Sequence, residues 1–278
     1  MRPLFRSEQI SALEECLYEA RKQLRRYWAG TLICLPDIDS ENNFCPTNTE
    51  YDLECQRILL DCLSKINIQI TIFTEESSSA ITFGNTGENL RLLIDPLDGT
   101  HNAFCGFPGY TSSVALYQNG TYTFGWIYDL SRDVVYTAAL GEGAYLQSPI
   151  IVKRLKTRDI KNLQDMRISF HRPTEAIERT KIESLMWATG KIRIYSCASL
   201  EICLIAAGVL DAFIDISTPG HERSCDIAAA ELILREAGGA LFDHNGVIRF
   251  SRPPSILSLS DNGSLIALSS ENLITLIL

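Results

Sequence analysis

The stretch Asp95-Pro96-Leu97-Asp98-Gly99-Thr100 follows directly on an apolar run over residues 90–94. The run predicts a short buried strand, and the proline and glycine after it predict a turn. Such a turn can point two aspartates three residues apart, together with the carbonyl of Leu97, at one position. Hard divalent cations such as Mg²⁺ prefer oxygen ligands of this kind. The alternative is an ordinary Asx turn that only closes the strand.

Glu75 stands in the same relation to another predicted strand, over residues 66–73. If this strand runs parallel to 90–94, the carboxyl ends of both strands lie at one edge of the sheet, where ligands of α/β proteins collect. A pair of adjacent glutamates is otherwise a common solvated turn. Beyond the first turn, Gly99 and Thr100 present backbone N–H groups at the expected start of a helix, which favours a phosphate oxygen.

Two further aspartates are expected near the starts of helices. Asp226 precedes an apolar run and is predicted to be the N-cap of a helix over 226–237. A capping carboxylate still has a second oxygen that can bind a metal. Asp52 is predicted at the third position of a helix that begins with a capping box at Thr49 and runs to about Lys65.

Hydrophobic spacing predicts an α+β first half and an α/β second half. The first half begins with an amphipathic helix that ends at Gly30, and residues 111–146 predict an antiparallel meander with a hairpin turn at Asn119-Gly120. In the second half, strands and helices alternate. The predicted strands there are 167–170, 192–195, 211–216, 240–243 and 265–268, and the predicted helices are 173–187, 199–207 and 226–237.

We predict two closely packed domains. The N-terminal domain, 1–147, carries the antiparallel sheet and most of the candidate metal ligands, and the C-terminal α/β domain, 148–278, carries Asp226. Residues 31–48 predict a long irregular loop, a feature that is usually mobile or functional. Its acidic residues are Asp37, Asp39 and Glu41. The loop either remains a solvated acidic segment or closes over the metal site.

Composition narrows the class of protein. The net charge is -9, whereas a nucleic-acid binder usually shows a basic patch, so we expect no nucleic-acid partner. A phosphorylated substrate would need bound cations to approach so acidic a chain. The nine cysteines form no C-x-x-C pair, which disfavours a zinc site and predicts free thiols in a reducing, cytoplasmic location. No apolar run of about 18 residues is present, so we expect no membrane span.

Together these motifs resemble the inositol monophosphatase family, which includes fructose-1,6-bisphosphatase-like and nucleotide 3′-phosphatase-like members. Residues 95–100 resemble the first family signature, and Glu75-Glu76-Ser77 resembles the upstream Glu-Glu-Ser at the family's spacing. Asp226-Ile-Ala-Ala-Ala, followed by Glu236-Ala-Gly-Gly239, resembles the second signature. The resemblance runs from about residue 49 to residue 243.

The resemblance implies a site with two or three Mg²⁺ ions. Glu75, Asp95 and the Leu97 carbonyl would hold one ion, Asp95, Asp98 and Asp226 would hold a second, and Glu75 would share a third. Thr100 with Asp52 would activate the attacking water. The implied substrate contacts are Asp98, Gly99, Thr100, Ser196, Cys197, Ala198, Asp215 and Asp226.

The sequence departs from the family pattern at three places. Cys225 replaces the usual Trp before the last Asp, and we expect it to affect packing more than metal binding. Ser196 replaces a usual Gly, and Cys197 follows it in place of Ser or Thr. The segment 217–224 is longer than in animal-type members, and its His221 and Arg223 either approach a second phosphate or form an exposed charged loop.

We therefore expect Mg²⁺-dependent hydrolysis of a small phosphorylated metabolite, with inositol-1-phosphate as the first candidate. The alternatives are a fructose-1,6-bisphosphatase, whose second phosphate would need Arg223, Arg193 or Arg172, and a nucleotide 3′-phosphatase. A metal-binding regulatory protein without turnover is the alternative of another class. The resemblance also implies a layered αβαβα sandwich and a homodimer.

Overall fold

The computed structural model describes residues 8–30, 50–84 and 90–278. The predicted loop 31–48 and the Thr49 start of the capping box lie outside the described residues. None of the helices in the described ranges is both long and apolar enough to cross a bilayer. The seven cysteines in those ranges are all free thiols.

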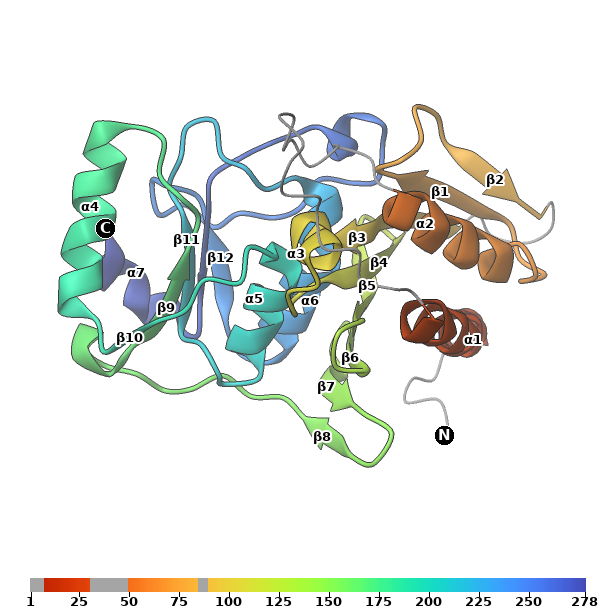
Figure 1. The fold of residues 1–278 in the computed structure, drawn as a ribbon, viewed down its shortest axis with the longest axis horizontal. Helices are drawn as coiled ribbons and strands as arrows, with labels where there is room; N and C mark the ends of the chain where they lie inside the picture. The colour runs from red at the N-terminus through yellow and green to blue at the C-terminus, as the bar shows by residue number, and fades with distance from the viewer. Residues whose placement is uncertain (1–7, 31–49, 85–89) are drawn as a thin grey trace.

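The first sheet has eight strands in the order β2-β1-β3-β4-β5-β6-β7-β8 (Figure 1). Their bounds are β1 Ile70–Thr74, β2 Ile81–Phe83, β3 Leu90–Asp98, β4 Thr111–Gln118, β5 Thr121–Asp129, β6 Val134–Ala139, β7 Gly143–Gln147 and β8 Val152–Arg154. β1 and β3 are parallel and their last paired residues are Thr74 and Ile94, so Glu75 and Asp95 follow this pair side by side. The predicted common edge is therefore confirmed. β4 to β8 form the antiparallel meander.

The second sheet has five strands in the order β10-β9-β11-β13-β12. β10, β9 and β11 are parallel, and β13 runs antiparallel to both of its neighbours. The strand bounds are β9 Arg167–Phe170, β10 Lys191–Ile192, β11 Ala212–Asp215, β12 Ala240–Phe242 and β13 Leu265–Leu268. The helices are α1 Glu8–Gly30, α2 Glu50–Leu63, α3 Thr100–Cys105, α4 Ala176–Ala188, α5 Ala198–Ala206, α6 Ser224–Glu236 and α7 Ile274–Ile277.

The elements stack in five layers, which confirms the αβαβα sandwich (Figure 1). α1 and α2 cover one face of the first sheet, α5 and α6 lie between the two sheets, and α4 and α7 cover the outer face of the second sheet. Each of the three helical layers has its own apolar cluster against a sheet. The division into two domains at residue 147 stays a prediction, and β8 extends the first sheet beyond that residue.

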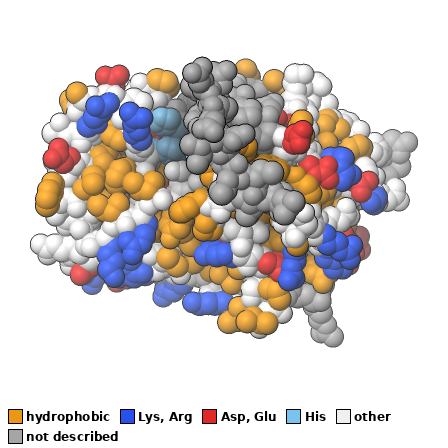
Figure 2. All heavy atoms as spheres, viewed as in Figure 1, with side chains coloured by type: hydrophobic (Ala, Val, Ile, Leu, Met, Phe, Trp, Pro, Cys, Tyr) orange, Lys and Arg blue, Asp and Glu red, His pale blue; other side chains and the backbone are white. Residues whose placement is uncertain are grey.

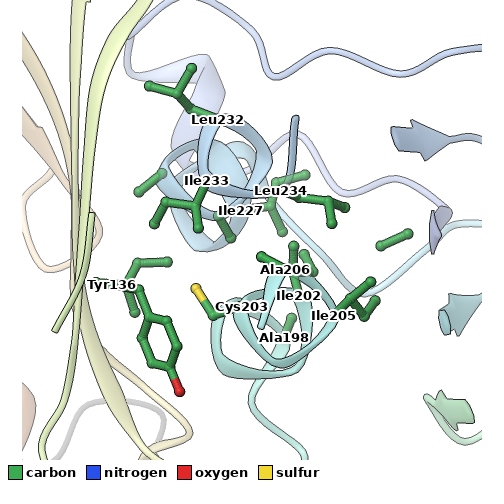
Figure 3. Close-up of a cluster of buried hydrophobic side chains, with 14 of the residues drawn as sticks. Tyr136, Ala198, Ile202, Cys203, Ile205, Ala206, Ile227, Leu232, Ile233 and Leu234 are labelled. Atoms are coloured by element: carbon green, nitrogen blue, oxygen red, sulfur yellow. The ribbon is translucent and has the colours of Figure 1, made fainter. Parts of the chain in front are cut away.

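The central layer is almost fully buried. Every residue of α5 is buried, as are the residues of α6 from Ser224 to Leu234. In Figure 3, Cys203 of α5 and Ile233 of α6 lie close to Tyr136 of β6, so both helices pack on the first sheet as well as on each other. Burial of this much apolar surface fixes where the two helices begin. Both begin next to candidate site residues, α5 at Ala198 and α6 at Ser224.

The structure corrects several predicted bounds. β1 begins at Ile70 and not at residue 66, while β3 continues through Asp98 because that residue pairs with Thr111 beyond a shift in register. β2 and β8 were not predicted; they are three-residue strands with no buried side chain to create a pattern. α4 begins at Ala176, three residues after Pro173, because Glu175 and Glu178 form a capping box there. Most other ends differ by one or two residues, as helix and strand ends commonly do.

Asp226 was predicted to cap α6, and this prediction is wrong. The helix begins at Ser224, its N-cap is Arg223, and Asp226 occupies the third helical position. Its carboxylate accepts the backbone N–H of Arg223 at 2.8 Å, which is the reciprocal half of a capping box. The carboxylate therefore points back over the helix start, where the helix dipole favours negative charge.

Gly125 of β5 provides a test of how tightly α6 packs on the first sheet. A Cβ at this position would lie 2.8 Å from the carbonyl oxygen of Ala229 and 3.2 Å from its Cα. We expect Gly125→Ala to lower the free energy of unfolding by about 1–3 kcal/mol, because backbone must shift to accept the methyl group. Urea unfolding followed by circular dichroism measures the change.

Gly30→Ala is the matched control for this substitution. Among the described residues, nothing lies within 4 Å of a Cβ at Gly30, which ends α1. We expect a change within about 0.5 kcal/mol. Equal unfolding free energies for Gly125→Ala and Gly30→Ala would contradict the close approach of α6 to β5.

Candidate active site

The candidate site lies where β1 and β3 end and α2, α3, α5 and α6 begin. Glu75 follows β1, and its backbone N–H donates to the carbonyl of Ile94 at 3.3 Å. Asp95 and Asp98 belong to the last residues of β3, and Asp226 to the first turn of α6. The structure thus gathers on one edge residues that are up to about 150 positions apart in the sequence.

The end of β3 holds its aspartates through local hydrogen bonds. Asp95 is 2% exposed, and its Oδ1 accepts the backbone N–H of Leu97 at 2.9 Å. Ser112 of β4 donates its hydroxyl to the carbonyl of Pro96 at 2.6 Å. The Asx geometry that we gave as the alternative is therefore present, and it leaves Oδ2 of Asp95 without a hydrogen-bond partner in the described part of the chain. Gly99 follows with a φ of 81°, a left-handed conformation that favours glycine.

Thr100 and Asp52 form the pair that the family resemblance implies. The hydroxyl of Thr100 lies 2.6 Å from Oδ1 of Asp52 and 2.9 Å from the carbonyl oxygen of Leu97. One hydroxyl proton can serve only one of these acceptors fully, so the other remains weakly bonded. Asp52 is buried at the start of α2, as predicted, and links that helix to α3.

Asp98 is held from the opposite side by the start of α5. Its Oδ2 accepts the backbone N–H of Ser199 at 2.8 Å, the hydroxyl of Ser199 at 2.5 Å and the thiol of Cys197 at 3.2 Å. Oδ1 of Asp98 has no such partner among the described residues. Ser199 was not among the predicted site residues, because it lies 101 positions away and no local motif connects it to Asp98.

Arg223 connects the two acidic groups that come from different halves of the chain. Its Nη1 donates to Oε1 of Glu75 at 2.6 Å, and its Nη2 and Nε donate to the two carboxylate oxygens of Asp226 at 3.0 and 3.1 Å. Arg223 was predicted as a contact to a phosphate, and the structure places it on these carboxylates. Its role toward a substrate stays a prediction.

We expected Cys225 to affect packing more than metal binding, but its thiol lies among the candidate ligand atoms. Its Sγ donates to Oδ1 of Asp226 at 3.2 Å, and one ligand atom from each of Glu75, Cys225 and Asp226 lies within 4.8 Å of the other two. Asp95 and Asp98 fall outside this tight group. The only sequence signal for Cys225 is its position directly before Asp226.

The carboxyl groups of the site are difficult to ionise without a cation. Burial raises the pKa of Asp95 well above its usual value, and the charges of Glu75, Asp226 and Asp98 raise it further. The pKa values of Asp98 and Glu75 are also raised, mainly by burial. Glu76, beside Glu75, has its pKa raised to about 7 by burial and by its acidic neighbours.

The donor set fits hard divalent cations. Its members are the carboxylates of Glu75, Asp95, Asp98 and Asp226 and the carbonyl oxygen of Leu97. A guanidinium already rests on two of these carboxylates, which marks the position as one that requires positive charge. Glu76 Oε2 is also buried without a hydrogen-bond partner in the described ranges. Oxygen-only ligands and excess negative charge are the features by which proteins bind Mg²⁺.

The remaining predicted substrate contacts lie on the C-terminal side of the site. Ser196 has a φ of 54°, a left-handed backbone conformation that favours glycine. Cys197 and Ala198 are buried at the start of α5. Asp215 is also buried, and its carboxylate accepts the backbone N–H groups of Ser217 and His221. Asp215 therefore holds the 217–224 segment in place, and its contact with substrate stays a prediction.

A cavity of about 310 Å³ opens beside this segment. Its lining residues are Phe170, His171, Arg172, Pro173, Ile194, Ser196 and Glu201. Burial opposes the protonation of His171, but its 2.7 Å contact with Glu222 raises its pKa above the ordinary value. Figure 2 shows Lys and Arg side chains beside a histidine on this face of the molecule. Ser196 lines the cavity, and the next residue, Cys197, donates to the carboxylate of Asp98, so the cavity lies next to the candidate metal ligands.

Comparison with known proteins identifies the family of this chain. A model of the inositol monophosphatase family matches residues 9–274. Nus factor SuhB of Pasteurella multocida is 30% identical over 206 residues, 71% of this chain and 72% of that one. A fructose-1,6-bisphosphatase/inositol-1-monophosphatase of Methanocaldococcus jannaschii is 28% identical over 229 residues, 82% of each chain. A solved Pyrococcus horikoshii structure, described as similar to inositol-1 monophosphatase, shares the fold, with a TM-score of 0.73 at 23% identity over 95% of this chain and 94% of that one. The chain belongs to the inositol monophosphatase family.

Proposed function

We propose that the protein is a Mg²⁺-dependent phosphatase that hydrolyses a small phosphate monoester, with inositol-1-phosphate as the first candidate substrate. The observation that carries the proposal is the group of ligand carboxylates beside the Thr100–Asp52 pair. In this pair the hydroxyl oxygen of Thr100 lies 2.6 Å from Oδ1 of Asp52. Membership of a metal-dependent phosphatase family supports the same reaction class. Two or three Mg²⁺ ions are proposed, because the donor set is large enough for more than one ion.

Each residue of the site has a defined task in this mechanism. Glu75, Asp95, Asp98, Asp226 and the Leu97 carbonyl would hold the ions. When bound, the ions neutralise charge on the phosphate and supply a water acidic enough to attack near neutral pH.

The Thr100 hydroxyl can accept a hydrogen bond from the attacking water while it donates to Asp52, whose carboxylate lies within hydrogen-bond reach as a proton acceptor. Ser199 and Cys197 fix Asp98 so that its free oxygen faces no other partner in the described part of the chain. The amides of Gly99 and Thr100 remain the proposed contacts to the phosphate.

A bisphosphate such as fructose-1,6-bisphosphate is the second candidate substrate, and the cavity beside Ser196 favours it. Arg172 lines this cavity, is exposed, and forms no ion pair with any described residue. The carboxylate of Glu201, which also lines it, accepts the backbone N–H groups of Tyr195 and Cys197 and is therefore already satisfied. Arg172 thus offers the unpaired positive charge that a second phosphate needs. The relative from Methanocaldococcus jannaschii carries both activities in its name.

A regulatory protein that binds metal without turnover is the alternative from another class. The intact Thr100–Asp52 pair favours turnover, because a protein that only binds metal needs no proton acceptor beside the ligands. Nucleotide 3′-phosphatase activity has no feature of the described residues in its favour. The homodimer, the cytoplasmic location and the absence of nucleic-acid partners stay predictions from the sequence.

Asp95→Asn tests the assignment of the metal ligands. Asparagine keeps the acceptor for the Leu97 N–H but removes the charge. We expect phosphate release to fall at least about 100-fold, because neutralisation of a transferring phosphoryl group by metals contributes several kcal/mol and each 1.4 kcal/mol is about tenfold. Asp243→Asn is the control, since Asp243 also accepts the N–H two residues onward, at 2.8 Å, outside the site. Near wild-type turnover of Asp95→Asn would overturn the assignment.

The same Asp95→Asn variant also has an expected stability without metal. The folded-state pKa of Asp95 lies above its ordinary value, so stability is lost as the pH rises from the ordinary pKa to the raised one. Removing the charge should therefore raise the melting temperature of the metal-free protein at neutral pH and change it little at low pH, where the carboxyl is protonated. Thermal unfolding in a chelator at several pH values measures this. A lower melting temperature at neutral pH would show that the carboxylate is stabilising.

Arg172→Gln tests the second candidate substrate. We expect KM for fructose-1,6-bisphosphate to rise about tenfold, because hydrogen bonds to charged groups contribute about 1.5 kcal/mol. KM for inositol-1-phosphate should stay within about twofold, since that substrate has no second phosphate. The control is Arg193→Gln, which removes a neighbouring exposed arginine that does not line the cavity. If Arg172→Gln raised KM by the same factor for both substrates, that result would argue against a second-phosphate site.

A further inference from the structure

We propose that Arg223 is a built-in counter-ion of the metal site. Its guanidinium contacts the carboxylate oxygens of Glu75 and Asp226 that would bind a metal, and it must leave these oxygens when a divalent ion binds. The inference rests on the metal binding of the proposed function, and it requires no turnover. It assigns to one side chain of this chain the control of how tightly the site takes up metal.

The contacts of Arg223 use oxygens that a cation would need. Nη1 lies 2.6 Å from Oε1 of Glu75, while Nη2 and Nε lie 3.0 and 3.1 Å from the two oxygens of Asp226. The Asp226 contact is the two-pronged form in which a guanidinium binds a carboxylate most strongly. Each of these Asp226 oxygens also accepts a second hydrogen bond, Oδ2 from the backbone N–H of Arg223 and Oδ1 from the thiol of Cys225, so neither has a lone pair left for an ion while the fork is in place.

The charge balance explains why the guanidinium rests there. Asp226 lies close enough to Glu75, Asp95 and Asp98 for its charge to raise the pKa values of all three. In the described ranges, Arg223 is the only cationic side chain that forms an ion pair with any of these four. A guanidinium stays protonated in proteins, so the Arg223 side chain is charged. Without metal, Arg223 is therefore the cation that offsets this group of acids.

The backbone allows the guanidinium to leave without loss of the helix start. The backbone N–H of Arg223 donates to Oδ2 of Asp226 at 2.8 Å, and this bond does not involve the side chain. The side chain is 29% exposed, so it has a route to solvent. Because Arg223 and a divalent ion compete for the same oxygens, removal of the guanidinium should tighten metal binding.

Calorimetric titration of Mn²⁺ or Mg²⁺ into metal-free protein tests the proposal. For Arg223→Gln we expect the dissociation constant to fall on the order of tenfold. The melting temperature of Arg223→Gln should be lower than wild type without metal and equal to wild type at saturating metal, because the acids are then neutralised in both proteins. Arg158→Gln is the matched control. Arg158 is 30% exposed and pairs with the buried Asp211 at 2.8 Å, away from the site, so its removal should leave the metal dissociation constant unchanged.

Arg223→Lys separates competition from simple charge repulsion. Lysine keeps the positive charge but cannot span both carboxylates with a fixed fork. Competition predicts that Arg223→Lys also binds metal several-fold more tightly than wild type, whereas repulsion alone predicts wild-type affinity for it. This variant also serves if Arg223→Gln fails to fold.

Unchanged or weaker metal binding in both variants would overturn the proposal, and so would tighter binding in Arg223→Gln alone. These outcomes remain distinct from failure of the proposed function. If wild type binds metal and releases phosphate while Arg223→Gln shows wild-type affinity, only the counter-ion role is wrong. If Arg223→Gln and Arg223→Lys bind metal more tightly but wild type releases no phosphate from any ester tested, the counter-ion role holds and the phosphatase assignment fails.

Discussion

The structure depends on one electrostatic constraint, namely that several carboxylates must lie together in a largely buried place. Burial and mutual repulsion raise the pKa values of Glu75, Asp95 and Asp98. Such an arrangement persists only if the backbone fixes each group and a cation offsets the charge. The parallel pairing of β1 with β3 places Glu75, Asp95 and Asp98, and the start of α6 supplies Asp226.

The five layers place these elements with little freedom. α5 and α6 are buried on both sides between the sheets, so the positions of their first residues follow from core packing (Figure 3). The start of α5 holds Asp98 through Ser199, and the start of α6 carries Asp226 and Arg223. The geometry of the candidate site is thus fixed by apolar burial between the two sheets. This explains how residues from segments that connect the strands of both sheets can lie together at one edge.

Local sequence patterns predicted the parts of the site that depend on local structure. The Asx geometry at Asp95, the pairing of strand ends near Glu75 and the place of Asp52 in its helix all follow from short motifs. The role of Ser199 could not be predicted, because the hydrogen bond to Asp98 joins residues 101 positions apart. The predicted N-cap at Asp226 was wrong because the apolar run indicates where the helix is buried, whereas the capping box at Arg223 decides where it begins.

We propose that metal ions held by these carboxylates activate water against a phosphate ester. Phosphate release by the wild-type protein, measured with Mg²⁺ and again after chelation, tests it most directly. Inositol-1-phosphate, fructose-1,6-bisphosphate and adenosine 3′,5′-bisphosphate would be compared side by side. The account predicts release from at least one ester with Mg²⁺, loss of release on chelation, and recovery when Mg²⁺ is restored. Turnover that is unchanged by chelation would contradict it.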